Sequence, residues 1–169
     1  MLNIVNNLKP FIEDCYKRIN VREYARLLRV SPPTASKMLD EHEKEGILIK
    51  EKDRNYLFFH ANNKNKVFIE LSRIYWFIKL NNLLEYFEKE LVNPTVILFG
   101  SLSKAESKID SDIDIAIFAS KKDLNIKQFE DKLKRKLQIF LFNSINEIPS
   151  KELTNSIING YVLKGRISL

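Results

Sequence analysis

Residues 95–118 constrain the fold more than any other part of the chain. The apolar run TVILF ends in Gly100-Ser101, and ten residues later Asp112 and Asp114 open a second apolar run, IDIAIF. Short runs of this kind, rich in β-branched residues and separated by turn residues, predict two strands. Side chains alternate along a strand, so the two aspartates face the same side of the sheet. Two carboxylates held this close repel each other, and the pattern predicts a cation between them.

The downstream sequence continues as an α/β pattern. Residues 125–136 predict an amphipathic helix, and residues 137–142 (LQIFLF) predict a third strand. The tail, PSKELTNSIINGYVLKG, predicts a further helix that ends near Gly160 and a short extended segment. We therefore expect a small α/β domain with a mixed sheet over residues 92–169.

The charge and cysteine content of the chain indicate its cellular environment but do not decide its function. The 169 residues carry a formal net charge of +6, which favours an anionic partner, but residues 1–65 and 66–169 each carry an excess of three positive charges. Cys15 is the only cysteine, so the sequence predicts no internal disulfide and a reducing, cytoplasmic environment. No apolar run approaches the roughly 18 residues of a membrane-spanning helix, and no signal-peptide pattern opens the chain, so no membrane partner is expected.

The N-terminal part predicts three helices followed by a β-hairpin. Residues 8–19 and 21–30 have apolar groups at helical spacing, and a third helix is expected to be capped by Ser31 and to end at Gly46. Residues 47–60 then predict two short strands around a polar turn, KDRN. This order resembles the winged helix-turn-helix of archaeal and bacterial transcription regulators, which implies double-stranded DNA as a partner.

The expected DNA contacts come from the third helix and the hairpin. Hydroxyl and lysine side chains at a helix N-terminus suit the major groove, and basic hairpin residues suit phosphates. The expected contact residues are Ser31, Thr34, Ser36, Lys37, Lys50, Lys52 and Arg54. The alternative interpretation is a winged helix used only for dimer or partner contacts. The acidic residues that follow on the third helix, Asp40, Glu41, Glu43 and Glu45, favour this alternative because they repel a phosphate backbone.

Residues 67–91 predict an amphipathic connecting helix with a bend or break near Asn81 and Asn82. Its apolar stripe, widened by Trp76 and Phe77, exceeds what one neighbour covers, so we expect it to connect the domains and to pair with a second copy in a homodimer. The sequence thus predicts an α+β protein with a winged helix over 1–62, a connecting helix over 63–91 and an α/β domain over 92–169.

The Gly100-Ser101 turn, the ten-residue interval and Asp112-x-Asp114, with their flanking strands, resemble the signature of minimal nucleotidyltransferases of the DNA polymerase β-like superfamily. The resemblance covers about residues 92–169 and includes the ending SIINGYVLKG. With the N-terminal part included, the chain resembles archaeal regulators in which a winged helix is fused to such a domain.

The resemblance implies a site for a metal and a nucleotide. Asp112 and Asp114 would be the catalytic pair that holds Mg²⁺ or Mn²⁺. A nucleoside triphosphate, with ATP as the expected one, would contact the backbone at Gly100, the hydroxyl and N–H of Ser101, and Lys104. Ser111 is assigned to the nucleotide site and, with Asp110, to the turn that aims the aspartates. Lys104 is equally well explained as a solvated helix lysine.

Two positions depart from the family pattern. Ala105 stands where the family usually has a glycine. The third carboxylate, which family members place on the next strand, is missing from residues 137–142, and Gln138 occupies the corresponding position. An amide coordinates a metal weakly and cannot accept a proton as a base, so nucleotide binding is expected to survive better than turnover.

Three hypotheses about function follow. The first is a DNA-binding regulator whose nucleotidyltransferase-type domain binds Mg-nucleotide. The second is an active enzyme that transfers AMP to a protein hydroxyl, as the resemblance implies for antitoxins paired with HEPN-type toxins. The third is a non-catalytic protein-interaction module.

Overall fold

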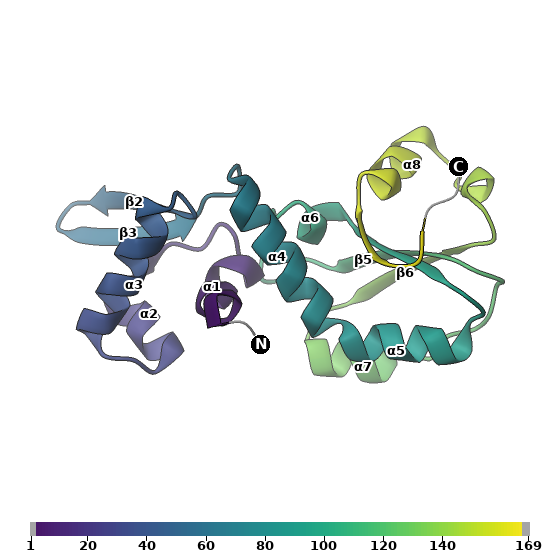
Figure 1. Ribbon diagram of the computed structural model, residues 1–169, viewed down its shortest axis with the longest axis horizontal. Helices are drawn as coiled ribbons and strands as arrows, with labels where there is room; N and C mark the ends of the chain where they lie inside the picture. The colour runs from purple at the N-terminus through teal and green to yellow at the C-terminus, as the bar shows by residue number, and fades with distance from the viewer. Residues whose placement is uncertain (1–2, 167–169) are drawn as a thin grey trace. The chain divides into compact units, whose positions relative to one another are not determined.

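The computed structural model describes residues 3–166, and within that range it contains eight α-helices, one 3-10 helix and two β-sheets (Figure 1). The mixed architecture confirms the predicted α+β class. Residues 1–2 and 167–169, which the predicted domains 1–62 and 92–169 include, lie outside the described residues. No helix in the described range is both long enough and apolar enough to cross a bilayer.

The chain divides into two compact units. The first comprises the described residues up to Tyr75 together with Ala105–Ile109, and the second comprises Trp76–Lys104 and the described residues from Asp110 onward. The first unit therefore holds a segment that lies, in sequence, between Gly100-Ser101 and Asp112.

The first unit combines three helices with a three-stranded antiparallel sheet. Its elements are α1 (Asn3–Glu13), β1 (Ile19–Asn20), α2 (Val21–Leu28), α3 (Pro32–Lys44), β2 (Leu48–Asp53) and β3 (Tyr56–Ala61). The sheet has the order β1-β3-β2. α3 begins as predicted, because the Ser31 side chain accepts a hydrogen bond from the Thr34 N–H. The hairpin turn is shorter than predicted, since Lys52 and Asp53 still pair with β3.

The predicted helix over residues 8–19 is wrong in its position. α1 runs from Asn3 to Glu13, and Ile19 and Asn20 instead form a strand that pairs with Phe59 and Phe58. The helix ends where the Asp14 side chain accepts a hydrogen bond from the Tyr16 N–H, which fixes a turn. A strand of two residues has no periodicity of its own, so only the partner strand reveals it.

The second unit is built around a four-stranded mixed sheet. Its elements, with α4 contributing residues to both units, are α4 (Lys66–Lys79), α5 (Asn81–Glu90), β4 (Thr95–Phe99), α6 (Gly100–Ser103), β5 (Ile113–Phe118), α7 (Lys127–Leu133), β6 (Leu137–Phe142), the 3-10 helix Ile145–Glu147, α8 (Lys151–Ile158) and β7 (Tyr161–Lys164). The strand order is β6-β5-β4-β7. β5 and β6 are parallel, and the other pairs are antiparallel. α7 is shorter than the predicted helix because Lys134 adopts a left-handed conformation, φ 54°.

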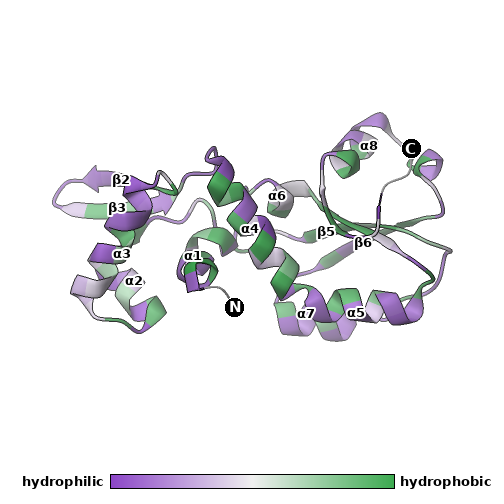
Figure 2. Ribbon diagram, in the orientation of Figure 1, coloured by the Kyte–Doolittle hydropathy of each residue, from purple (hydrophilic) through white to green (hydrophobic). Residues whose placement is uncertain are grey.

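Helices cover both faces of this sheet (Figure 1). α8 packs on one face, where Ile157 joins a buried cluster with Ile97, Phe99, Ala116 and Phe142. α5 and α7 lie on the other face and contact each other through the rings of Tyr86 and Phe129, whose centroids are 5.1 Å apart. Apart from Asp114, β5 consists of apolar residues, as expected for a strand with both faces covered (Figure 2).

The predicted connecting helix over residues 67–91 breaks at Leu80 into α4 and α5, close to the predicted position. Trp76 is fully buried within the chain, so its role in the predicted dimer surface is wrong. Phe77 and Val67 remain 39% and 56% exposed. The homodimer itself stays a prediction, with less apolar surface to support it.

His42 is a buried histidine on α3 whose two ring nitrogens have no hydrogen-bond partner among the described residues. Burial lowers its pKa below the ordinary value, and the negative charges of Glu45 and Glu41 oppose that shift only in part. Because the folded state favours neutral imidazole, acidification stabilises the unfolded chain relative to the folded one.

We therefore expect the first unit to lose stability as the pH falls from 7.5 to 5.5, through the pKa of an unfolded histidine. His42→Leu should remove this component, whose slope cannot exceed about 1.4 kcal/mol per pH unit for one proton. Urea unfolding of both proteins at each pH, followed by circular dichroism, measures it. Equal pH dependence in the two proteins would show that His42 does not contribute.

Candidate active site

Three neighbouring strands bring the two sequence motifs together. Asp114 on β5 is directly opposite Phe99 on antiparallel β4 and opposite Gln138 on parallel β6. Phe99 packs in the cluster beneath α8, so Asp114 and Gln138 lie on the α8 face of the sheet as well. Gly100 follows Phe99 immediately, and the Gly-Ser turn therefore starts beside the second aspartate.

Gly100 makes the closest approach in this site. Its φ of 70° is left-handed, and a Cβ at this position would lie 2.2 Å from Oδ2 of Asp114. Any larger residue would displace the carboxylate and adopt a strained backbone conformation. The position of the Asp114 side chain is thus one reason why residue 100 is a glycine. The predicted close approach of a triphosphate is a second reason.

The electrostatics of the aspartate pair are unfavourable without a cation. Burial raises the pKa of Asp114, and the negative charge of Asp112 raises it further. Both effects disfavour the ionised form, which is the form that binds a metal ion. A divalent cation between the two carboxylates would reverse both effects, so the donor set fits Mg²⁺ or Mn²⁺.

Gln138 lies beside Asp112, and its Nε2 donates a hydrogen bond of 2.8 Å to Oδ2 of that aspartate. Within residues 3–166 no group of three or more His, Cys, Asp or Glu side chains lies close enough together to hold a metal ion, so no third carboxylate joins Asp112 and Asp114. The aspartate pair is therefore completed by a neutral amide rather than by a third carboxylate.

The other predicted nucleotide contacts are distributed around this centre. Ser101 is half-buried at the second position of α6, and Lys104 is exposed where α6 ends. The carbonyl of Ser111 accepts a hydrogen bond from Arg135, so Ser111 forms part of a fixed turn before Asp112. The roles of these residues in nucleotide binding stay predictions.

Residues Ala105–Ile109, between the two motifs, are anchored within the first unit. The Ser107 side chain is fully buried, and its Oγ donates a 2.6 Å hydrogen bond to the carbonyl of Ile12. The Ser107 carbonyl accepts a 2.8 Å hydrogen bond from the Cys15 N–H. Ala105 is buried with φ 56°, a left-handed conformation that explains the glycine expected there.

The predicted DNA contacts on α3 are accessible but partly engaged. Thr34 and Lys37 are exposed, and Lys37 pairs loosely with Glu41 at 3.9 Å. Ser31 is occupied as the helix cap, and Ser36 lies 3.4 Å from a carboxylate oxygen of Asp40. Acidic residues of α3 are thus paired with Lys37 and Ser36, two of the side chains predicted to contact DNA.

The hairpin presents its cations unequally. Lys50 forms a 2.7 Å ion pair with Asp40, whereas Lys52 and Arg54 are exposed near the turn. Arg18, which sequence reasoning missed, pairs with Glu51 at 3.1 Å and with Asp53 at 3.2 Å. Arg18 thereby neutralises the acidic face of β2, and Lys52 and Arg54 remain the best placed for phosphates.

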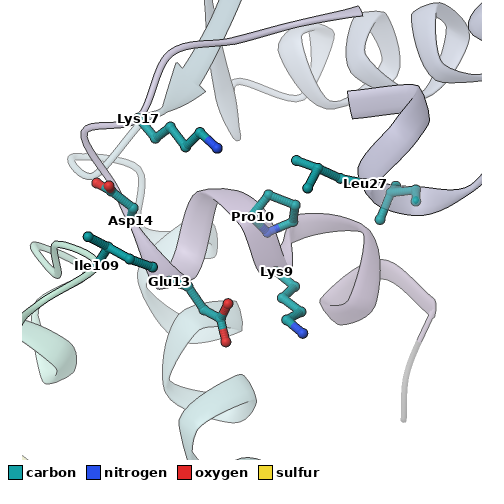
Figure 3. A pocket seen from close by; sticks show the side chains of 8 residues that line it. Lys9, Pro10, Glu13, Asp14, Lys17, Leu27 and Ile109 are labelled. Atoms are coloured by element: carbon teal, nitrogen blue, oxygen red, sulfur yellow. The ribbon is translucent and has the colours of Figure 1, made fainter. Parts of the chain in front are cut away.

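A pocket of about 520 Å³ lies in the first unit (Figure 3). Its lining comes from α1, the loop after α1, α2 and the anchored segment: Lys9, Pro10, Glu13, Asp14, Lys17, Leu27, Leu28 and Ile109. It contains none of the residues that the sequence assigns to metal, nucleotide or DNA.

The geometry of the second unit agrees with a comparison with protein families. Residues 81–166 match the family described as polymerase beta, nucleotidyltransferase, and the match covers just over half of the chain, from α5 to β7. The chain belongs to this nucleotidyltransferase family. Neither curated proteins nor solved structures gave a match. The family confirms the predicted type of the C-terminal domain and leaves the N-terminal unit unassigned.

Sequence reasoning missed Arg135, which holds the turn before Asp112, and Ser107, which anchors the segment between the two motifs in the first unit. Arg135 sits in a run of basic residues, KLKRK, that looks like a solvated helix end. Ser107 sits in a polar stretch that looks like a loop. Their partners, Ser111 in one case and Ile12 and Cys15 in the other, lie far away along the chain. The sequence around each residue does not predict such contacts.

The close approach of Gly100 to Asp114 can be tested against a second glycine. Gly46 also has φ 70°, but a Cβ there would lie 3.4 Å from its nearest neighbour. Gly46→Ala and Gly100→Ala should each cost about 1–2 kcal/mol of stability from the left-handed backbone. Only Gly100→Ala should displace the Asp114 carboxylate and weaken Mn²⁺ binding, by about tenfold or more, as followed by electron paramagnetic resonance. Equal affinities in the two variants would contradict this geometry.

Proposed function

We propose that this chain is a DNA-binding regulator whose nucleotidyltransferase domain binds a Mg²⁺-nucleoside triphosphate. The observation that carries the proposal is the arrangement of Gly100, Asp112 and Asp114, in which burial and the charge of Asp112 raise the pKa of Asp114 beside a backbone turn without side-chain bulk. Membership of the nucleotidyltransferase family supports the nucleotide.

In this proposal Asp112 and Asp114 hold Mg²⁺ or Mn²⁺, and the turn at Gly100 and Ser101 receives the phosphates. The bound metal ion would neutralise phosphate charge and orient the nucleotide. The chain's own contribution is to hold the two carboxylates on one face of β5 and to keep the backbone beside Asp114 free of a side chain. ATP is the expected nucleotide.

Transfer of the nucleotide is the second candidate function, and the family favours it. An acceptor hydroxyl, such as one on a partner protein, would attack the α-phosphorus of ATP and lose its proton, and the bond from that phosphorus to the leaving pyrophosphate would break. Gln138 occupies the place beside Asp112 where a third carboxylate would take up that proton, and an amide cannot do so. We therefore propose that transfer is slow compared with nucleotide binding.

The DNA-binding part of the proposal rests on the first unit. Three helices followed by a hairpin, with β1 added to an antiparallel sheet of order β1-β3-β2, support a winged helix-turn-helix. The exposed residues Thr34 and Lys37 on α3, and Lys52 and Arg54 in the hairpin, are the contacts that we propose for duplex DNA.

The anchored segment supports regulation by nucleotide. Ala105–Ile109 packs in the first unit, while the residues on either side of it, Lys104 and Asp110, belong to the second. A shift of the Gly-Ser turn or of Asp112 on nucleotide binding would therefore pull on a segment that is hydrogen-bonded to α1 and Cys15. Such a link would couple the two binding events.

The nucleotide site predicts a stabilisation that depends on the metal. Mg²⁺ or Mn²⁺ with ATP should stabilise the fold by mass action, by about 2.7 kcal/mol at a hundredfold excess over the dissociation constant. Asp112→Asn combined with Asp114→Asn should abolish the gain and stabilise the ligand-free protein by removing repulsion. Thermal unfolding with and without metal and ATP measures both effects. A gain that persists in the double variant would place the ligand elsewhere.

Transfer can be tested with the same proteins and radiolabelled ATP. The unmodified chain should label an acceptor slowly, and Gln138→Asp should increase the labelling by restoring a carboxylate beside Asp112. Gln138→Asn, which shortens the side chain equally but adds no carboxylate, is the matched control. Rapid labelling by the unmodified chain would show that another group acts as the base and would favour the second candidate function.

The hairpin predicts an unequal salt dependence for DNA binding. With a 20-bp duplex of random sequence as the probe, Lys52→Ala and Arg54→Ala should each lower the slope of log affinity against log salt by about 0.9. Lys50→Ala should lower it less, because Asp40 already neutralises that lysine. Lys122→Ala, which removes the same charge from an ion pair in the second unit, is the control. A slope that is unchanged by Lys52→Ala and Arg54→Ala would remove the hairpin from the DNA site.

A further inference from the structure

Arg135 is a buried cation near the site, and the proposed function gives it no role. Among the described residues that are buried, it is the only one with a permanent positive charge, at 8% exposure. It lies in the turn between α7 and β6, just after Lys134 ends the helix in a left-handed conformation. A buried guanidinium is costly unless hydrogen bonds and packing compensate for its lost hydration.

The surroundings of Arg135 provide that compensation. Its Nη1 donates a 2.6 Å hydrogen bond to the carbonyl of Ser111. Its guanidinium carbon lies 5.2 Å from the centre of the fully buried Trp76 ring, which gives a cation–π contact. The Glu130 carboxylate accepts a hydrogen bond from the Leu137 N–H and so holds the end of the same turn. These contacts therefore hold the guanidinium in one position.

The hydrogen bond from Arg135 ends one residue before Asp112. On the other side of Asp112, the Ile113 N–H donates a 2.9 Å hydrogen bond to the carbonyl of Lys136. Two successive residues of the turn, 135 and 136, thus hold the backbone on both sides of the aspartate. Gln138, two residues further on, contacts the Asp112 carboxylate itself.

We propose that Arg135 is a positioning residue for Asp112: its guanidinium clamps the Ser111 carbonyl and thereby fixes where the Asp112 carboxylate lies relative to Asp114. The proposal rests on the proposed function, in which Asp112 holds the metal. Arg135 touches neither metal nor nucleotide in this role. A carboxylate displaced by a fraction of an ångström loses part of its metal affinity, because hard cations demand defined oxygen positions.

The test compares Arg135→Met, Arg135→Lys and Lys136→Met in the full-length chain. Methionine preserves much of the length and the contact with Trp76 but removes the donor and the charge. Lysine keeps the charge and one donor group. Lys136→Met removes an exposed charge from the adjacent residue and controls for long-range electrostatics. If Arg135→Met does not fold, the comparison is made with Arg135→Lys.

Two quantities are measured, and one of them needs no ligand. Hydrogen exchange of the Ile113 amide in the ligand-free protein should be at least about tenfold faster in Arg135→Met than in the unmodified chain. Mn²⁺ affinity in the presence of ATP should fall about tenfold in Arg135→Met, by a smaller factor in Arg135→Lys, and by less than about twofold in Lys136→Met. Urea unfolding confirms that the variants are folded under the assay conditions.

The outcomes separate the positioning role from the proposed function. Unchanged Mn²⁺ affinity in folded Arg135→Met overturns the positioning role, even where Ile113 exchange is faster, because the arginine would then be only structural. An equal loss in Lys136→Met also overturns it, since bulk charge would explain the effect. If the unmodified chain binds no Mn²⁺ with ATP, the proposed function fails, and the exchange of Ile113 alone then decides whether Arg135 clamps the turn.

Discussion

The register of β4, β5 and β6 is the constraint on which the site depends. Antiparallel pairing sets Phe99 opposite Asp114, and parallel pairing sets Gln138 opposite the same aspartate. A one-residue slip of β5 would turn both aspartates to the other face of the sheet, where α5 and α7 pack. The buried residues that alternate with the aspartates, Ile113 and Ile115, oppose this slip because it would move them out of their packing. The hydrophobic core thus fixes the polar site.

The site combines two aspartates that we propose to hold a metal ion with an amide at the third position. Gly100 leaves room for the Asp114 carboxylate, and Asp112 stays beside it at an electrostatic cost that a divalent cation would relieve. Gln138 fills the third position with an amide, which satisfies Asp112 by a hydrogen bond. This chemistry supports our proposal that the domain binds a nucleotide better than it turns it over.

The sequence predicts much of this site because its signals are local. The strands at 95–99, 113–118 and 137–142 follow from apolar runs between turn residues, and the position of Gln138 follows from counting along the third run. Contacts between distant segments could not be predicted. β1 has only two residues and depends on β3, Arg135 depends on Ser111, and Trp76 is buried although its helix pattern suggests an exposed face.

The central claim is that Asp112 and Asp114 hold a divalent metal in the presence of nucleotide. Paramagnetic broadening of backbone amide signals by substoichiometric Mn²⁺ with ATP tests it most directly, because broadening falls off steeply with distance from the ion. We expect the amides of Gly100, Ser101, Asp112 and Asp114 to broaden first, and we expect Asp112→Asn with Asp114→Asn to abolish the effect. Broadening confined to other acidic residues, or unaltered in the double variant, would contradict the claim.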